Sequence, residues 1–233
     1  MSEAEKLQQL ARQVKQHFEN SHCGHDYFHA ERVAALALDI ARHSAAPVDR
    51  FVLLSTALVH DLCRPFERET GKSHFGEEAL SIIAAKLEDC SFSDQEIDKI
   101  ASLVRYHDVF DLALIPELSL ELKIHQDADR LEAIGAIGIA RVFAFGAANG
   151  LPMYIPGESL VFSATFVDRP DHRTSSISHF YDKLLKLKDQ MHTERGRELA
   201  LERHALMEQY LEHFFREWGK APSWDQALDV GVS

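Results

Sequence analysis

Several histidine and aspartate residues stand where the sequence predicts burial, and together they could bind a metal ion. His60 and Asp61 end a segment that begins at Leu53 and is apolar on every face of the predicted helix, so we expect it to be buried. A buried carboxylate is normally paired, hydrogen-bonded or bound to a metal, because its desolvation is costly. A His-Asp pair alone is a weak motif, however, and a structural histidine is its commoner explanation.

Other predicted helices bring similar side chains to core-facing or terminal positions. His29 shares a stripe with Val33, and Asp127 and Asp129 stand at the start of a predicted apolar helix that runs through about Phe145. An aspartate at a helix start is ordinarily a cap, which explains one of these carboxylates but hardly both. Imidazole and carboxylate donors together suit Mn²⁺, Fe or Zn²⁺, and three or four protein ligands leave open positions for water and substrate. The sequence therefore predicts a catalytic site for a divalent ion.

The elements that must position these groups are all predicted to be helices. Apolar spacing, capping signals and breakers give helices over residues 4–19, 29–42, 50–62, 75–87, 94–107, 127–145, 176–191 and 194–218. Residues 66–73 are expected to form a charged loop, and residues 147–175 an irregular segment with possible short strands or a flap over the site. The apolar face of the last helix is expected to consist of Leu199, Leu206, Tyr210, Phe214 and Trp218. Strand signals are too few for a sheet, so we expect an all-α bundle.

Composition is typical of a globular protein. Of the 233 residues 45% are hydrophobic, enough for a substantial core, and we find neither a signal peptide nor an apolar run long enough to span a membrane. The three cysteines form no CxxC pair, which fits a reducing compartment. A net charge of −12 argues against a general nucleic-acid surface but allows an anionic small molecule. We therefore expect a cytoplasmic protein with neither a nucleic-acid nor a membrane partner.

The order of the candidate ligands resembles that of the HD-domain superfamily of metal-dependent phosphohydrolases. The resemblance rests on His29 in His-Ala-Glu-Arg-Val, on His60-Asp61, and on Asp129 in Asp-Ala-Asp-Arg-Leu. It implies that His29, His60, Asp61 and Asp129 are the metal ligands. Asp129 is preferred to Asp127 because the last ligand of the superfamily sits in an Ala-Asp-x-Leu context. Asp127 is then a cap or a group that supports the ligands.

Longer segments resemble a bacterial subgroup of small single-domain HD hydrolases, some of which are regarded as Mn²⁺-dependent nucleotide pyrophosphohydrolases. The segments are Gly-His-Asp-Tyr-Phe-His-x-x-Arg-Val, Gln-Asp-Ala-Asp-Arg-Leu-Glu-Ala-Ile-Gly-Ala-Ile-Gly-Ile-Ala-Arg and His-Phe-Tyr-Asp-Lys-Leu-Leu-Lys-Leu-Lys. The resemblance implies one HD-type domain over residues 1–233, with a core at about 20–146 and an irregular segment and closing helices at about 147–218. It also favours Mn²⁺ as the ion, with Mg²⁺, Fe, Co, Ni or Zn²⁺ as alternatives.

Further residues are candidates for catalysis or for support of the ligands. His25 and Asp26 precede His29 closely, and either could position water or hold a ligand, so the general base stays open. His107 lies on a core-facing stripe just before Asp108, where a role toward substrate or a second ion is as well supported as a structural role.

A metal ion would neutralise only part of the negative charge of a polyphosphate substrate, so we expect cationic side chains to bind the rest. Arg64 follows the His-Asp pair, and the family resemblance favours Lys183 in the C-terminal helices. His74 opens a helix beside a polar, accessible loop, and a structural role is favoured for it over a role toward substrate or a second ion.

Together these features predict a hydrolase that cleaves nucleoside or deoxynucleoside triphosphates to monophosphate and pyrophosphate. A divalent ion would lower the pKa of water and withdraw charge from a phosphoryl oxygen. The nearest alternative is a nucleotide phosphomonoesterase. From another class come a non-catalytic HD-fold protein that binds nucleotide or metal, and a helical interaction module. The expected ligand is a phosphorylated small molecule, and the chain is expected to be a monomer or a homodimer.

Overall fold

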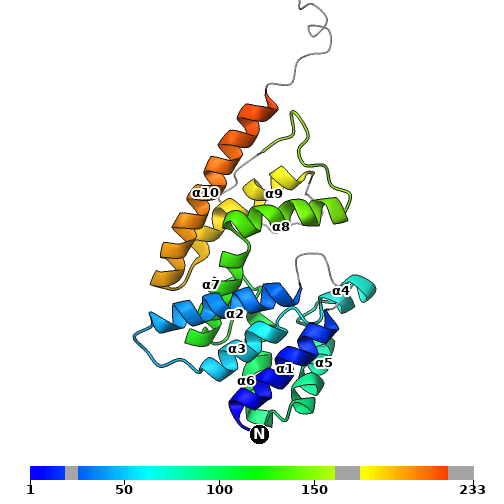
Figure 1. The fold of residues 1–233 in the computed structure, drawn as a ribbon, viewed down its shortest axis with the longest axis vertical. Coiled ribbons are helices and arrows are strands. Elements are labelled where there is room, and N and C mark those ends of the chain that lie inside the picture. Colours follow the sequence, from blue (N-terminus) through cyan, green and yellow to red (C-terminus); the bar gives the residue numbers. More distant parts are fainter. Residues whose placement is uncertain (19–25, 161–173, 220–233) are drawn as a thin grey trace, which may run out of the picture.

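The chain folds into helices joined by turns and loops (Figure 1). The computed structural model describes residues 1–18, 26–160 and 174–219, and this part of the chain contains no strand. The all-α architecture expected from the sequence is confirmed. In chain order the elements are α1 (Glu3–His17), α2 (Tyr27–Arg42), α3 (Arg50–Val59), α4 (Arg64–Thr70), α5 (Glu77–Asp89), α6 (Asp94–Tyr106), the 3-10 segment η1 (Leu112–Leu114), α7 (Leu120–Glu132), α8 (Gly135–Ala148), α9 (Ser176–Asp182), the 3-10 segment η3 (Leu184–Gln190) and α10 (Glu194–Trp218).

Side-chain caps start the helices that end at the interior of the molecule. Ser93 and Glu96 form the predicted capping box on α6, each side chain accepting a hydrogen bond from the backbone N–H of the other residue. Asp49 caps α3 in a similar way through the N–H of residue 52. Both helices end at residues that lie in the interior of the molecule. These terminal residues are His60 and His107.

Two clusters of buried apolar side chains hold the helices together. The first lies among α1, α3, α5 and α6 and includes Leu10 and Ile100. The second lies among α2, α7, α8, α9 and α10 and includes Val33 and Met207. Figure 1 shows α1 to α6 in the lower part of the view, α8 to α10 in the upper part, and α7 between them. Because α7 packs against α2, α3 and α10, most of its residues are buried, including polar ones.

The helix that carries Asp127 and Asp129 begins earlier than the sequence predicts. α7 follows the N-cap Ser119, so both aspartates lie in its last two turns rather than at a helix start. The second half of α7 is buried on nearly all sides, and it therefore lacks the one apolar stripe by which a surface helix is recognised. The single helix expected through Phe145 is also divided. The chain bends by 67° between α7 and α8, where Gly135 has a φ of 78°.

Two segments expected to be irregular differ in outcome. Residues 64–70 form α4, so the charged loop expected over residues 66–73 is wrong as far as residue 70. Pro65 is compatible with the helix because it occupies the first turn, where its missing N–H is not needed. Gly71 ends this helix in the left-handed conformation, with φ at 72°. The segment after α8 is irregular as far as residue 160, without a strand over residues 149–160.

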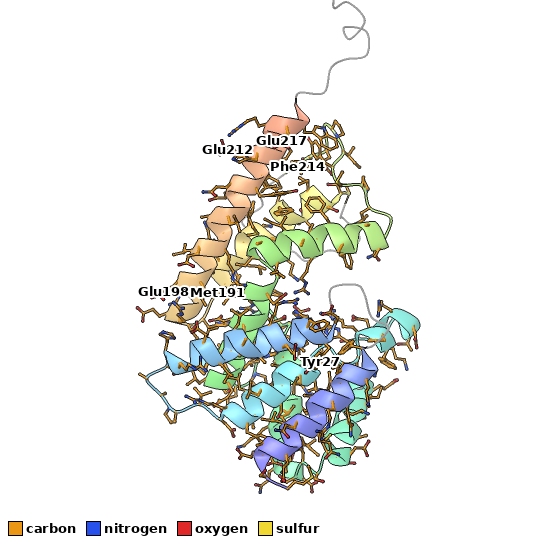
Figure 2. All side chains as sticks on the ribbon, in the orientation of Figure 1. Tyr27, Met191, Glu198, Glu212, Phe214 and Glu217 are labelled. Atoms are coloured by element: carbon orange, nitrogen blue, oxygen red, sulfur yellow. The ribbon has the colours of Figure 1, made fainter. Side chains whose placement is uncertain are left out.

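α10 buries only part of the predicted face, on which Leu199 and Tyr210 pack against the second cluster. Leu206 is 41% exposed and Trp218 is 37% exposed, whereas the buried side carries Ala200 and Met207. Phe214, labelled in Figure 2, does pack against the second cluster near the end of the helix. The contact of α10 with α7 begins at small residues, which a search for large apolar side chains overlooks.

We examined the described helices for membrane spans. No single one is long and apolar enough to cross a bilayer, and α7 and α8 reach that length and composition only when taken as a bent pair.

Candidate metal centre

The four predicted ligands come from α2, α7 and the end of α3, and their side chains converge. Nε2 of His29 lies 3.3 Å from Nε2 of His60, 3.5 Å from Oδ2 of Asp61 and 3.4 Å from Oδ1 of Asp129. Nε2 of His60 lies 3.6 Å from the same Asp61 oxygen and 3.7 Å from the same Asp129 oxygen. Residues far apart in sequence therefore present two imidazole nitrogens and two carboxylate oxygens to one region.

The spacing and chemistry of these donors fit a divalent transition-metal ion. Donors placed tetrahedrally about 2.1 Å from an ion lie about 3.4 Å apart. The donor atoms of His29, His60 and Asp61 all lie within 4.8 Å of one another, and Oδ1 of Asp129 lies beside the two histidine nitrogens. His29, His60 and Asp61 are buried, whereas the Asp129 side chain is 23% exposed, so the cluster meets solvent at Asp129. Water and substrate need such an open side to reach a bound ion.

Hydrogen bonds with the backbone orient the two histidines. Nδ1 of His60 lies 2.9 Å from the carbonyl oxygen of Ala57, so Nδ1 donates and Nε2 is left as an acceptor toward the cluster. Asp26 is the N-cap of α2, and its carboxylate accepts a hydrogen bond of 2.8 Å from the backbone N–H of His29. Asp26 thereby fixes the first turn of the helix that carries a candidate ligand.

The other ring nitrogen of His29 meets a carboxylate that the sequence analysis missed. Nδ1 lies 3.2 Å from Oε2 of Glu132. The Glu132 carboxylate also accepts a hydrogen bond from Arg32 of α2 at Oε1 and one from Arg141 of α8 at Oε2. Glu132 is only 1% exposed, and these donors compensate the burial of its charge. Its position three residues after Asp129, on the same side of α7, is the signal that could have identified it.

The electrostatics of the cluster favour a cation at its centre. Burial would lower the pKa of His29, but hydrogen bonds with Asp129, Asp61 and Glu132 raise it to about 10. Burial would raise the pKa of Asp129, and hydrogen bonds with His29 and His60 hold it well below its usual range. Burial would also raise the pKa of Glu132, but the hydrogen bond with His29 and the nearby charge of Arg141 lower it to about 2. The buried carboxylates are therefore ionised, and a proton on His29 or a metal ion compensates them.

A second group of possible ligands adjoins the first through Asp61. Nε2 of His74 lies 3.6 Å from Oδ1 of Asp61 and 3.4 Å from Nε2 of His107, and these three residues are spaced to hold a metal ion. Nδ1 of His107 donates a 2.7 Å hydrogen bond to the carbonyl oxygen of Val104, which leaves Nε2 toward the group. Burial lowers the pKa of both imidazoles, that of His74 to about 4, so both rings are neutral near pH 7.

His74 does not stand beside an accessible loop, contrary to what the sequence analysis predicts. The residue is 1% exposed, its Nδ1 lies 3.0 Å from Oε2 of Glu67, and its ring packs against Phe75 and His107. Glu67 belongs to α4, the helix that the sequence analysis took for a loop. The error at His74 therefore follows from the error at α4.

His125 is a further buried histidine that the sequence analysis did not single out. Its ring centroid lies 5.0 Å from that of His60 and 6.1 Å from that of His107. The residue is fully buried, and neither ring nitrogen has a hydrogen-bond partner among the described residues. Its spacing of four residues before Asp129 places both on one side of α7, which was the available signal.

Asp127 contacts the start of α10 and does not cap α7. Its Oδ1 accepts a 2.8 Å hydrogen bond from the N–H of His192. Its Oδ2 accepts one of 2.8 Å from the N–H of Thr193 and one of 2.7 Å from the Thr193 hydroxyl. The structure therefore accounts for this buried carboxylate by helix packing, and the expectation of a helix-start cap on its own helix is wrong.

The predicted substrate-binding cations lie in different surroundings. Nε of Arg64 donates a 2.7 Å hydrogen bond to Oδ1 of Asp61, so its positive charge stands beside the cluster. Nζ of Lys183 lies 5.4 Å from the ring centroid of Phe110, which Arg130 also covers. His25, the remaining predicted residue, lies outside the described residues.

Comparisons with known proteins agree with this arrangement. The family model of the HD domain matches residues 26–134, which include the four converging residues. The uncharacterized protein YpgQ of Bacillus subtilis is 35% identical over 214 residues, which are 91% of this chain and 93% of that protein.

Solved structures are similar as well. The crystal structure of an HD-superfamily hydrolase from Bacillus thuringiensis has a TM-score of 0.69 and 33% identity, covering 94% of this chain and 100% of that one. The crystal structure of YpgQ in complex with ADP has a TM-score of 0.69 and 32% identity, covering 97% of this chain and 100% of that one. These similarities show that the chain belongs to the HD superfamily, among small bacterial hydrolases similar to YpgQ.

Proposed function

We propose that the protein is a metal-dependent phosphohydrolase whose ion is held by His29, His60, Asp61 and Asp129. The observation that carries the proposal is that one carboxylate oxygen of Asp61 and one of Asp129 each lie 3.4–3.7 Å from Nε2 of both histidines, which are themselves 3.3 Å apart. Mn²⁺ is the proposed ion, because it accepts both imidazole and carboxylate ligands, and Fe, Co, Ni, Zn²⁺ and Mg²⁺ are alternatives.

The chain itself supplies the charge and the orientation that phosphoryl chemistry needs. A bound divalent ion would lower the pKa of water and withdraw charge from a phosphoryl oxygen. Arg64 is held by Asp61 and by Glu67 at 3.2 Å, so it offers a fixed positive charge beside the reacting phosphate. His107 and His74 are neutral imidazoles with the proton on Nδ1, so the lone pair on Nε2 of each ring can bind a second ion.

The proposed substrate is a nucleoside or deoxynucleoside triphosphate, cleaved to monophosphate and pyrophosphate. The complex of YpgQ with ADP supports a nucleotide, because that relative is 32% identical to this chain over nearly its whole length. A nucleotide also fits the charges, since Arg64 is paired with Asp61 of the cluster and its side chain is 25% exposed. The pairing of Arg64 with carboxylates holds its side chain in place before substrate binds.

A substrate screen with two readouts tests this function. Nucleoside mono-, di- and triphosphates are incubated with Mn²⁺, Mg²⁺, Co²⁺, Ni²⁺ or Zn²⁺, and both phosphate and pyrophosphate are measured. We expect pyrophosphate from triphosphates with Mn²⁺, and none with a chelator or in His60→Ala. The matched control is His43→Ala, since the His43 side chain is 52% exposed on α2's C-terminal side.

Other outcomes separate the alternatives. Phosphate released from monophosphates would identify a phosphomonoesterase in place of a pyrophosphohydrolase. Release of neither product by a protein that contains its full complement of metal would refute the hydrolase and leave a binding protein.

A further inference from the structure

Nδ1 of His29 faces two groups that require opposite tautomers of the ring. Oε2 of Glu132 lies 3.2 Å from Nδ1 and can only accept, so it requires a proton on Nδ1. Nη1 of Arg141 lies 3.0 Å from the same nitrogen and can only donate, so a bond from Arg141 requires Nδ1 without a proton. In that second tautomer the neutral ring carries its proton on Nε2. Nε2 is the atom that faces the other candidate ligands, and a proton there would exclude an ion.

We propose that Glu132 selects the tautomer that binds metal and is therefore a positioning residue for His29. Its carboxylate is held by Arg32 at Oε1 and by Arg141 at Oε2. Nη1 of Arg141 carries two N–H groups: one donates to Oε2, and the other can reach the backbone carbonyl oxygen of Glu132 at 3.4 Å, so neither has to meet Nδ1. The N–H of Nδ1 then shares Oε2 with Arg141. Nδ1 then keeps its proton, and the lone pair of Nε2 points at the cluster. This inference rests on the ligand set proposed above, but Glu132 itself is not one of the ligands.

Packing alone does not explain this arrangement. A buried ion pair is a weak stabilising device, because apolar residues of similar volume often serve as well. The informative feature is the direction of the Glu132 carboxylate toward the second nitrogen of a candidate ligand. Histidine ligands of metal sites commonly donate their other N–H to a carboxylate, which fixes the tautomer and raises the basicity of the ligating nitrogen. α8 also takes part in this geometry, since it supplies Arg141.

The experiment measures Mn²⁺ affinity by calorimetry on metal-stripped protein without substrate. Glu132→Gln removes the charge at nearly constant volume, and we expect affinity to fall by about 10- to 100-fold while the helical circular dichroism is kept. Glu132→Asp keeps the charge and is expected to recover most of the affinity. The matched control is Glu77→Gln, which removes a carboxylate paired with Arg105 on the surface and should leave affinity unchanged.

A double variant separates tautomer selection from general loss of charge. Glu132→Gln combined with Arg141→Gln removes the donor that competes for Nδ1, so it is expected to bind Mn²⁺ more tightly than Glu132→Gln alone. If Glu132→Gln folds poorly, Arg32→Gln replaces it, because the Arg32 side chain is 40% exposed and its loss should still weaken binding severalfold.

Wild-type affinity in a folded Glu132→Gln protein, or no recovery in the double variant, would overturn the inference. Tight binding of Mn²⁺ by the wild type without release of pyrophosphate or phosphate would instead overturn the proposed function and leave the role of Glu132 intact.

Discussion

Asp127 and Asp129 stand two residues apart on α7, yet we predict that replacement by asparagine affects a different property of the protein at each position. Asp127 accepts three hydrogen bonds at the start of α10, two at Oδ2 and one at Oδ1. Asp129 instead lies 3.4 Å from His29 and 3.7 Å from His60. Asp127→Asn should therefore lower stability, and Asp129→Asn should lower metal affinity.

The cost of Asp127→Asn follows from the atoms that meet. An asparagine keeps one oxygen and replaces the other with an N–H₂ group, so one or two hydrogen bonds are lost, depending on how the amide is turned. Each hydrogen bond to a charged group contributes about 1.5–3 kcal/mol, so the loss of one or two should cost about 1.5–6 kcal/mol. Little adjustment is possible, because a Cβ added at Gly196 would lie 2.4 Å from Oδ2 of Asp127. For a chain of this size the melting temperature should fall by about 3–24 °C.

Asp129→Asn removes a carboxylate that is paired with His29 and His60, so the effect that distinguishes it from Asp127→Asn is on metal binding. Its Mn²⁺ affinity should fall at least about tenfold, and activity with it. Differential scanning calorimetry with a chelator and titration calorimetry with Mn²⁺ measure the two quantities on the same preparations. The reasoning is refuted if Asp127→Asn loses metal while keeping its melting temperature, or if Asp129→Asn binds Mn²⁺ as the wild type does.

Three further predictions concern the metal, His107 and pH. His60→Ala and Asp61→Ala should abolish metal binding in elemental analysis, and a chelator should lower the melting temperature of the wild type, because an ion that binds only the native state stabilises it. His107→Gln should lower kcat by about two orders of magnitude with little change in melting temperature, and a destabilised but fully active variant would show a structural role. The pKa of Glu96 lies below its ordinary 4.5: burial alone would raise it, but the ammonium group of Lys6, 2.7 Å away, lowers it. A carboxyl group whose pKa is lowered on folding stabilises the fold at pH values above the pKa it has in the unfolded chain, and this contribution is lost as the pH falls through its folded pKa. Glu96→Gln should therefore cost about 0.5 kcal/mol at pH 7 and nothing in strong acid. An equal loss of melting temperature at both pH values would contradict this account.

The sequence by itself determined the all-α class, the starts of several helices and the residues most able to bind metal. These features depend on local signals, such as the capping box at Ser93 and Glu96, the apolar run that ends at His60, and the spacing of His29 with Val33. The same local rules failed where burial is not one-sided. α7 is buried on nearly all sides, so its polar residues concealed the helix and displaced its predicted start.

Only the tertiary structure decided which groups surround the candidate ligands. Glu132 meets His29 across 103 residues of sequence, and Asp127 meets the start of α10 across 65. His74 becomes buried because α4 forms and supplies Glu67. Such contacts depend on how helices pack, and a periodic pattern gives the inner face of a helix without the partner it will meet. The candidate ligands could therefore be predicted from the sequence. The contacts that orient them and set their pKa values form only when α2, α7, α8 and α10 pack together.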